Sequence, residues 1–307
     1  MIGGLILDRD HGPGRGGAVM MLAAMRQKPG LISLIVTTYE WPQALLRVLE
    51  CLSRQRDDNF EIVVADDGSG AATAEAIRQF QRSCRVPLRH SWQPHQGFRA
   101  AESRNRAVLS SRGDYLIFLD GDCLARADFL RAHRELAEPG WFVAGNRALL
   151  SQRFTARLLP SAEAVADWSA RPLGGWLGAR LRGDINRLTP MLHPPPGWQR
   201  KNRPREWRGA KTCNLAVWRE DFLKVDGFDE SYVGWGHEDA DLAVRLIRGG
   251  ILRKEGRFGA SVLHLWHAAA PRQELGSNEQ RLAEVLAAQR TRAVLGISRE
   301  RPALQDT

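Results

Sequence analysis

Residues 115–122, Tyr-Leu-Ile-Phe-Leu-Asp-Gly-Asp, join a run of five apolar or aromatic residues to an acidic turn. A run this short, bounded by a turn, is typical of a strand buried on both faces of a sheet. Gly121 allows a tight turn, so we expect Asp120 and Asp122 at the carboxyl end of an internal strand, where open α/β sheets bind ligands. Two carboxylates there suit a divalent ion such as Mg2+ or Mn2+ that bridges to a substrate phosphate. The alternative is an Asp-rich turn that only ends a core strand.

Polar clusters also follow the two earlier predicted strands, Leu31–Val36 and Phe60–Ala65. The first strand runs into Thr37-Thr38-Tyr39 and the second into Asp66-Asp67-Gly68-Ser69. Strands alternate with segments of helical spacing, which predicts a doubly wound α/β fold: a mostly parallel central sheet flanked by helices, with these clusters along one edge. The other helices predicted begin at Pro42, cover Ala71–Phe80, Ala100–Ser110 and Asp128–Leu136, run from Glu238 to Gly249 and cover Glu279–Leu295. The other strands predicted lie near Val86–His90, within Trp141–Leu150 (Phe142 and Val143, ending at Gly145-Asn146), and over Lys211–Trp218 and Ala260–Leu263.

The composition is ordinary for a globular protein, with 43% hydrophobic and 26% charged residues among 307. The formal net charge of +9 favours an anionic partner, namely a nucleotide, a nucleic acid or an anionic membrane surface. Four scattered cysteines without metal-ligand spacing indicate free thiols in a reducing compartment. No apolar stretch reaches the roughly 18–20 residues that span a bilayer. We therefore expect a cytoplasmic protein, with a peripheral position at the inner face of the cell membrane as an alternative.

The chain is expected to form one domain with terminal extensions. Residues 1–29 show neither a strand nor a helix period and are predicted to be disordered. The domain covers 30–275, with a first half over about 31–125 and a second over about 126–270, and a helix and tail follow over 276–307. One helix of the second half either packs on the core or contacts a membrane surface. Its near-helical apolar residues are Trp176, Leu177, Leu181, Ile185 and Leu188, and its basic residues are Arg180, Arg182 and Arg187.

The first half contains four motifs in order: Thr37 to Tyr39, Asp66 to Ser69, Ser103-Arg104-Asn105 and Asp120-Gly121-Asp122. Together they resemble the family 2 inverting glycosyltransferases, which implies a GT-A-like, Rossmann-like fold whose first half binds a nucleotide-sugar donor. The binding residues that this resemblance implies are Thr37 and Tyr39 against the nucleoside, Asp66 or Asp67 on the N–H of uracil or thymine, Asp120 near the ribose, Asp122 on a metal at the diphosphate, and Arg99 and Arg104 beside that diphosphate.

A second acidic cluster lies in Gly234-Trp235-Gly236-His237-Glu238-Asp239, at the start of a predicted helix. Carboxylates in a first helical turn are commonly capping residues, but capping explains neither the glycines nor the flat indole of Trp235. With the upstream Asp226-Gly227-Phe228, this stretch resembles the β-1,4-galactosyltransferases and their bacterial relatives, which carry a glycine where His237 stands. The resemblance implies that Asp239 is the catalytic base and that Glu238 holds the acceptor sugar, within an acceptor site that includes Trp235, Gly236 and His237.

Helical geometry separates the acidic residues of this cluster. Residues two apart diverge by about 200°, so Asp239 and Asp241 cannot both face a sugar. We expect Asp241 to be a structural cap or the partner of Arg245, one turn further on. A helix N-terminus lowers the pKa of a carboxylate, so Asp239 needs an apolar wall to act as a base, and Trp235 is the candidate.

Two histidines follow the last predicted strand, in His264-Leu265-Trp266-His267. By the same resemblance they occupy metal-ligand positions and complete a site with Asp122, whereas a chance pair of histidines is the alternative. Imidazole ligands favour Mn2+ over Mg2+, because Mg2+ strongly prefers oxygen.

The sequence therefore predicts a metal-dependent glycosyltransferase that moves a sugar from a nucleotide-diphosphate donor, a UDP-sugar first, to a hydroxyl of a saccharide or lipid-linked glycan with inversion. A retaining glycosyltransferase of the same fold is the nearest alternative. A sugar-1-phosphate nucleotidyltransferase would open on a Gly-rich loop, which Leu31–Pro42 lacks. From another class, the charge of +9 fits a basic nucleic-acid-binding protein. The basic residues are dispersed and no reader motif is found, so we expect no nucleic-acid partner.

Overall fold

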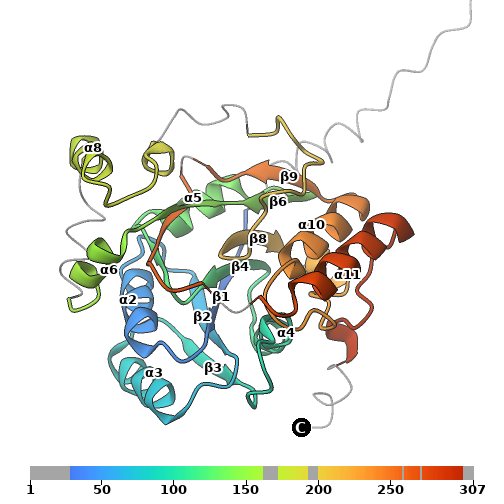
Figure 1. Cartoon of the computed structure of the whole chain (residues 1–307), viewed down its shortest axis with the longest axis horizontal. Helices are drawn as coiled ribbons and strands as arrows, with labels where there is room; N and C mark the ends of the chain where they lie inside the picture. The colour runs from blue at the N-terminus through green and yellow to red at the C-terminus, as the bar shows by residue number, and fades with distance from the viewer. Residues whose placement is uncertain (1–27, 162–171, 193–199, 258, 270–271, 300–307) are drawn as a thin grey trace, which may run out of the picture.

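The computed structural model describes residues 28–161, 172–192, 200–257, 259–269 and 272–299 (Figure 1). Their centre is a seven-stranded sheet in the order β3-β2-β1-β4-β8-β6-β9, flanked by helices. The extension predicted over 1–29 lies outside the described residues except for Lys28 and Pro29. Lys28 Nζ donates to the Glu135 carbonyl oxygen at 2.7 Å. Among the described residues, no helix is both long enough and apolar enough to cross a bilayer.

Strand β1 (Ile32–Thr38) lies between β2 (Phe60–Asp66) and β4 (Tyr115–Asp120), and both neighbours run parallel to it. The register pairs Thr37 with Asp120 and Thr38 with Asp66, so the polar ends of these strands meet at one edge. The mostly parallel sheet predicted from the sequence is therefore confirmed. Its other members are β3 (Leu88–Trp92), parallel to β2, β8 (Asn214–Trp218), antiparallel to β4, β6 (Trp141–Ala144), antiparallel to β8, and β9 (Leu252–Glu255), parallel to β6.

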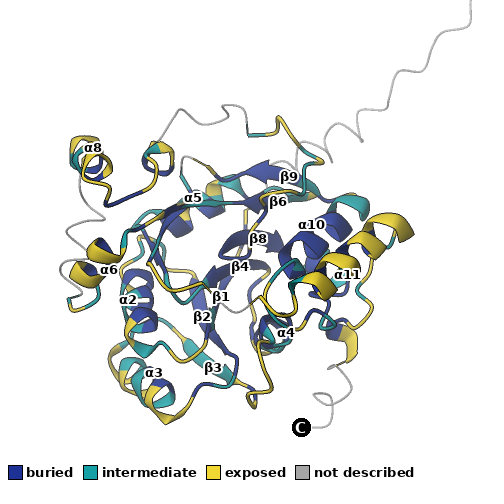
Figure 2. Ribbon diagram, viewed as in Figure 1, coloured by how far each residue is buried: buried dark blue, intermediate teal, exposed yellow. Residues whose placement is uncertain are grey.

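Alternate residues of β1 enter two separate cores, because the sheet is covered on both faces. Leu34 packs in one cluster with Leu49 of α2 (Pro42–Ser53), a helix that begins with proline. Ile35 packs in the other cluster with Val108 of α4 (Ala100–Ser110) and Leu242 of α10 (Glu238–Arg248). Figure 2 shows both the central strands and α10 as buried. The remaining helices are α3 (Ala71–Ser83), α5 (Phe129–Leu136), α6 (Gln152–Leu158), α8 (Leu173–Leu181), α9 (Arg219–Lys224) and α11 (Leu275–Ala288), with short 3-10 turns η1 (Thr189–Met191) and η2 (Ile297–Arg299).

A second, three-stranded sheet in the order β5-β10-β7 lies beyond the end of β4. Strand β5 (Cys123–Ala125) directly follows Asp122, and β10 (Ser261–His264) pairs antiparallel with it, so that His264 lies opposite Cys123. The Leu265 N–H also donates to the Asp122 carbonyl oxygen at 2.9 Å. This pairing carries the two-histidine segment to the acidic turn. Strand β7 (Asn146–Leu149) pairs parallel with β10 on its other side.

Two expected helices differ in extent. The strand predicted within Trp141–Leu150 ends before Gly145, as expected, and a side chain at Gly145 would collide with Asn214; β7 of the second sheet follows it and was not predicted. The helix containing Trp176 ends at Leu181, because Gly183 follows with φ 73° and Ile185 then bridges to Leu150. Ile185 and Leu188 are therefore not part of that helix. The closing helix begins at Leu275 and ends at Ala288 instead of covering Glu279–Leu295.

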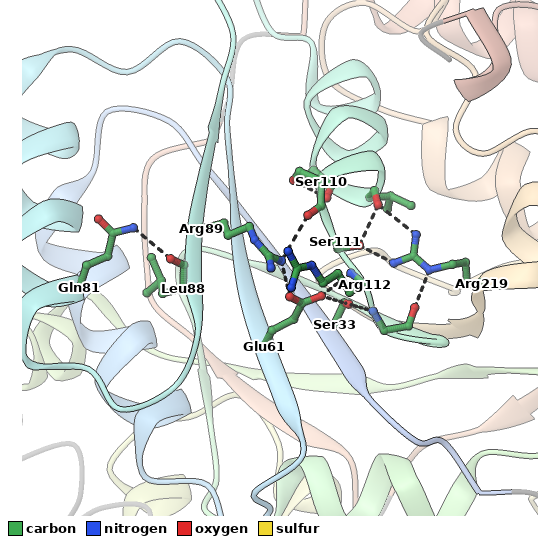
Figure 3. A network of polar contacts seen from close by, with 12 residues as sticks. Ser33, Glu61, Gln81, Leu88, Arg89, Ser110, Ser111, Arg112 and Arg219 are labelled. Atoms are coloured by element: carbon green, nitrogen blue, oxygen red, sulfur yellow. Dashed lines mark hydrogen bonds and ion pairs between the residues drawn. The ribbon is translucent and has the colours of Figure 1, made fainter. Parts of the chain in front are cut away.

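A polar network occupies the amino edge of the main sheet, opposite the acidic turn (Figure 3). Glu61 accepts hydrogen bonds from Ser33 Oγ at 2.7 Å, from the Arg112 N–H at 2.5 Å and from Arg89. Arg219, directly after β8, donates to backbone carbonyl oxygens near the end of α4. Burial raises the pKa of Glu61, but its hydrogen bonds outweigh that effect and hold the pKa below its ordinary range. Both carboxylate oxygens of Glu61 accept hydrogen bonds, so the polar groups at this edge stabilise the fold.

Candidate active site

Arg104 is the centre of the polar cluster at the carboxyl edge, although it lies on helix α4. Its side chain is 4% exposed, and its guanidinium reaches three elements. Nε donates to Thr37 Oγ1 at 2.9 Å, Nη2 to Asp120 Oδ1 at 3.3 Å and Nη1 to Glu238 Oε1 at 3.1 Å. Burial lowers the pKa of Arg104, but the charges of Asp120 and Glu238 outweigh burial and raise it. One cation thus ties the ends of β1 and β4 to the start of α10.

Asn105, the next residue of α4, joins the same helix to the second half of the chain. Its Nδ2 donates to the Phe228 carbonyl oxygen at 2.9 Å, and the Phe228 N–H donates back to Asn105 Oδ1 at 2.9 Å. Nδ2 also donates to Glu230 Oε1 at 2.8 Å. Gly227 has φ 69°, and a side chain there would meet Asn105 Oδ1 at 2.7 Å, so this position requires glycine. The Ser-Arg-Asn and Asp-Gly-Phe motifs form one joint, which we call the α4 joint.

Asp122, His264 and His267 lie together, as the resemblance implies. One ligand atom of each lies within 4.8 Å of the other two. Asp122 Oδ2 is 3.6 Å from His264 Nε2 and 3.3 Å from His267 Nε2. Burial raises the pKa of Asp122 and lowers that of His264, so neither group has a neighbour that fully stabilises its charged form. One carboxylate and two imidazoles form a donor set that fits Mn2+ better than Mg2+.

Asp239 lies in the first turn of α10, among the charged residues at the carboxyl edge of the sheet. Its Oδ2 is 3.4 Å from Lys211 Nζ, whereas no hydrogen-bond donor among the described residues reaches its buried Oδ1. Burial and the neighbouring charge of Glu238 raise the pKa of Asp239, although Lys211 and Arg104 oppose the shift. Burial thus overcomes the effect of the helix N-terminus that the sequence predicts. A buried carboxylate with a free oxygen and a raised pKa has the properties of a general base.

Asp241 has the structural role expected for it. Arg245 Nε donates to Asp241 Oδ2 at 2.8 Å, and both side chains are fully buried. The Arg245 guanidinium also donates to the carbonyl oxygens of Val225 and Gly227 at 2.7 and 2.8 Å. This pair holds α10 against the segment that precedes the α4 joint.

Tyr39 and Asp66 lie in a region of histidines that the sequence analysis did not single out. The Tyr39 ring stacks on His95 with a centroid separation of 4.6 Å and an interplanar angle of 14°. Asp66 Oδ2 is 2.8 Å from His90 Nε2, and Asp66 Oδ1 accepts from the Ser69 N–H at 2.8 Å. Burial raises the pKa of Asp66, but these hydrogen bonds outweigh it and lower the pKa. Asp66 is therefore held ionised within the end of β2.

Asp67 and Arg99 meet through the backbone and not through their charges. The Arg99 N–H donates to Asp67 Oδ2 at 2.6 Å, and Gln93 Nε2 donates to Asp67 Oδ1 at 2.8 Å. The Arg99 guanidinium instead pairs with Glu102 Oε2 at 2.9 Å on its own helix. Arg104, and not Arg99, is thus the cation that reaches Asp120.

The loop before α10 has unusual backbone conformations. Gly236 has φ 112° and His237 has φ 75°, in the left-handed region that favours glycine. The position of His237 therefore explains on backbone grounds why the galactosyltransferases that this segment resembles carry a glycine. Trp235 is 40% exposed, and the Arg272 guanidinium lies 5.1 Å from its ring centroid. The Arg272 guanidinium thus covers one face of the indole, while the Trp235 side chain remains partly exposed.

Several residues of this region were missed by the sequence analysis. Lys211 comes just before β8 and reaches Asp239 only because β8 runs antiparallel to β4. Cys123, Cys213 and Asp120 also place ligand atoms within 4.8 Å of one another, and Arg147 Nη1 lies 3.1 Å from Cys213 Sγ. All four cysteines of the chain are free, as expected. No sequence spacing pointed to this meeting, because the contacts depend on how the two sheets join.

Sequence comparisons give the class of the protein. Residues 33–174 match glycosyl transferase family 2, and residues 196–259 match the segment described as the N-terminal domain of galactosyltransferase. The chain belongs to glycosyltransferase family 2 and carries a galactosyltransferase-like segment in its second half. Both resemblances inferred from the motifs are therefore confirmed.

Two individual proteins illustrate how similar the chain is to its relatives. It is 31% identical over 229 residues to validoxylamine A glucosyltransferase of Streptomyces hygroscopicus subsp. jinggangensis (strain 5008), covering 72% of this chain and 52% of that protein. It is 26% identical over 227 residues to hyaluronan synthase of Pasteurella multocida, covering 71% of this chain and 23% of the relative. The chain thus spans about half, or less, of the length of these two relatives.

Solved structures confirm the GT-A fold. TarS 1-349 from S. aureus in complex with UDP aligns with a TM-score of 0.57 and 14% identity, covering 88% of this chain and 68% of that one. The mannosyltransferase PcManGT from Pyrobaculum calidifontis, in complex with GDP-Man and Mn2+, aligns with a TM-score of 0.51 and 18% identity, covering 86% and 64%. At these identities the likeness concerns the fold alone.

Proposed function

We propose that this chain transfers a sugar from a nucleoside-diphosphate donor, a UDP-sugar first, to a hydroxyl of a saccharide or lipid-linked glycan, with inversion at the anomeric carbon. The observation that carries the proposal is the meeting, at one sheet edge, of the Asp122–His264–His267 cluster with Arg104 and Asp239. The relatives support it, because one is named a glucosyltransferase and the structural neighbours hold UDP, UDP-GlcNAc or GDP-Man.

Asp122, His264 and His267 would hold the divalent ion, preferably Mn2+. When bound, the ion offsets the negative charge that develops on the departing diphosphate, the largest electrostatic demand of the reaction. Two structural neighbours contain Mn2+, which supports a metal of this kind. Arg104 holds Thr37 and Asp120 in place at the same edge, so the donor site is ordered before the substrate arrives.

Asp239 would take the proton from the attacking acceptor hydroxyl. Its raised pKa makes it a stronger base than an exposed aspartate, and its Oδ1 has no competing donor among the described residues. Glu238 is held by Arg104, and Trp235 and the two residues after it form the adjoining loop on which an acceptor sugar would lie. A single displacement with one base inverts the anomeric centre, whereas a retaining reaction gives the opposite product.

The nucleoside would lie against Tyr39 and Thr37, with an aspartate of the 66–67 pair accepting the base N–H. One face of the Tyr39 ring stacks on His95 and the side chain is 45% exposed, which supports stacking of a base on its other face. Asp66 keeps its negative charge through hydrogen bonds from His90 and Ser69, so it can accept a further N–H donor.

A ligand panel tests donor and metal together. The thermal midpoint of the full chain is measured with UDP-, dTDP- and GDP-sugars, each with Mn2+, Mg2+ or excess chelator. We expect a UDP-sugar with Mn2+ to raise the midpoint most, because a ligand that binds only the folded state stabilises it by mass action. NMR of the anomeric proton of the product then distinguishes inversion from retention. A chain that responds to no nucleotide sugar, but shifts an oligonucleotide in a salt-sensitive way, would support the nucleic-acid-binding alternative.

The metal ligands are tested by replacing both histidines. The double variant His264→Ala, His267→Ala should weaken Mn2+ binding by at least about 100-fold in isothermal titration, because two of three protein ligands are lost. Replacing His95, which stacks on Tyr39 instead, provides a matched histidine control whose Mn2+ affinity should not change. Full activity in excess chelator, or unchanged Mn2+ binding by the double variant, would contradict the metal assignment.

A further inference from the structure

Helix α8 has an apolar stripe on the side that faces away from the core. Leu173, Leu177 and Leu181 are 51%, 48% and 80% exposed. A spacing of four residues turns each leucine only about 40° from the one before, so the three lie along one side of the helix. Trp176 and Ala179 are buried and hold the other side against the protein. Figure 2 shows α8 at the periphery of the molecule with its outer surface exposed. The helix is therefore anchored along one side, and no other part of the described chain covers its opposite side.

A cluster of arginines lies beside this stripe. The buried Asp184 accepts from Arg153 Nη2 at 3.0 Å and from Arg182 Nε at 3.1 Å, and Arg157 Nη2 lies 3.0 Å from its Oδ1. Among the described residues, three guanidinium groups around one carboxylate leave two positive charges without an acidic partner, and the exposed Arg180 adds a third. Burial raises the pKa of Asp184, but the arginines outweigh it and lower the pKa, so the carboxylate keeps its charge and holds them. We call this surface the α8 face: Leu173, Leu177, Leu181, Arg153, Arg157, Arg180 and Arg182.

We propose that the α8 face binds the surface of an anionic lipid bilayer. A membrane surface offers acyl chains covered by a layer of phosphate groups. The leucines on one side of this short helix can enter the acyl region while the neighbouring arginines bind the phosphates. A second copy of the chain is a poorer occupant, because a symmetric contact would bring the same uncompensated arginines together. An acidic soluble partner would use the arginines but not the exposed leucine stripe.

The α8 face is firmly connected to the second sheet. The Ser151 N–H donates to the Asp184 carbonyl oxygen at 2.9 Å, and the Asn186 N–H donates to the Leu149 carbonyl oxygen at 3.1 Å at the end of β7. Strand β7 pairs with β10, which carries His264. Binding of the α8 face to a bilayer would therefore fix the orientation of the metal cluster relative to the membrane. The membrane inference itself does not depend on the proposed reaction.

Vesicle co-sedimentation of the full chain tests the proposal. We expect binding to vesicles of phosphatidylcholine mixed with phosphatidylglycerol, little binding to phosphatidylcholine alone, and weaker binding as salt is raised. The variant Leu177→Asp, Leu181→Asp should lower the partition coefficient at least about tenfold, because two apolar contacts become charged. Leu286→Asp, at a leucine of α11 that is 37% exposed, is the matched control and should bind as the wild type does.

A second pair of variants tests the charge. Arg180→Gln with Arg182→Gln should weaken binding and reduce its salt dependence, while Arg153 and Arg157 still pair with Asp184. Arg78→Gln with Arg82→Gln, on the exposed side of α3, removes the same net charge elsewhere and should have a smaller effect. If the leucine variant unfolds, Leu181→Asn alone replaces the test, because that side chain is 80% exposed.

Three results would overturn the proposal. One is equal sedimentation with anionic and neutral vesicles, and another is unchanged binding by the leucine variants. The third is a dimer in light scattering that Leu177→Asp, Leu181→Asp converts to a monomer while the wild type ignores vesicles, which would identify a second copy as the occupant. A chain that binds vesicles but lacks transferase activity would support the α8 face and refute only the proposed reaction.

Discussion

The two edges of the main sheet are both rich in charged residues, yet they are built in opposite ways. At the amino edge, Glu61 has donors on both oxygens and a lowered pKa. At the carboxyl edge, Asp239 keeps one buried oxygen without a donor among the described residues, and its pKa is raised. Asp122 shows the same upward shift.

The difference shows what each edge does. A carboxylate that has donors on both oxygens and a lowered pKa is held ionised by the fold and stabilises it. A buried carboxylate with an incomplete set of hydrogen bonds costs stability, and such groups concentrate where a substrate, metal or proton completes them. Charge alone therefore does not identify the site. An unmet hydrogen bond is not sufficient either, because Asp221 Oδ2 and Asp241 Oδ1 are also buried without a donor among the described residues. The position of Asp239 beside Lys211 and Arg104 is therefore the second criterion.

Replacement of the proposed base should have the largest effect. Asp239→Asn should lower kcat by about 100-fold to 10,000-fold, because the amide cannot take the acceptor proton. Wild-type kcat/KM should fall on acidification at a pH above the ordinary aspartate range, because the pKa of Asp239 is raised. Ionisation of this group opposes folding above its pKa, so the variant should melt at the same temperature as the wild type or higher. A variant with near-wild-type turnover would remove Asp239 from this role.

Asp241→Asn should affect stability and not chemistry. The change leaves the buried Arg245 without its ionic partner and should lower the free energy of unfolding by about 3–5 kcal/mol. Chemical denaturation measures the loss, and kcat of the folded fraction should stay near the wild-type value. Loss of turnover at unchanged stability would mean that the two aspartates of α10 have been assigned the wrong way round.

At the amino edge, Glu61→Gln should cost about 1–3 kcal/mol, because Ser33, Arg89 and Arg112 lose part of a charged acceptor. The folded pKa of Glu61 lies below its unfolded value of about 4.3, so the stabilisation is complete above that pH and is lost as pH falls through the folded pKa. Urea titrations at several pH values should show the difference between variant and wild type narrowing below about pH 4. A difference that widens in acid would show that the network is not what stabilises this edge.

The smallest expected effect concerns the backbone of the carboxyl edge. His237→Gly should raise the free energy of unfolding by up to about 1 kcal/mol, because glycine adopts φ 75° without strain. Differential scanning calorimetry can resolve the resulting shift, and His237→Ala is the matched control that keeps the strain. Equal midpoints for the two variants would show that the imidazole and not the backbone matters here.

The sheet could be predicted because its signal is local. The runs at Leu31–Val36, Phe60–Ala65 and Tyr115–Asp120 are apolar except for Ser33, Glu61 and the terminal Asp120, and each leads into a polar turn, so strand, direction and edge follow from neighbouring residues. The limits of α8 and α11 were missed, because Gly183 and Gln289 end those segments through left-handed conformations that no periodicity reveals.

The candidate site was only partly predictable, because several of its contacts join segments that are distant in the sequence. The motifs supplied Asp122, Asp239 and the two histidines, and the fold brings the metal cluster together. Lys211 and His95 were missed, because their positions depend on an antiparallel strand and on a loop that folds back toward Tyr39. The sequence indicated that Asp239 needs burial to offset the helix N-terminus, and the pKa of Asp239 is raised by burial, but the segments that bury it could not be inferred from sequence.

The α4 joint limits how the two halves can be recombined. Arg104 and Asn105 are adjacent on one helix, yet the first holds Asp120 at the carboxyl edge and the second holds the Gly227-Phe228 turn. An engineer who grafts the second half of a relative onto this first half would have to transplant the glycine and the turn geometry with it, or the graft would tilt α10 and its Asp239. The substrate preference of such chimeras should then depend on how well the two halves fit at the α4 joint as much as on which residues line the pocket.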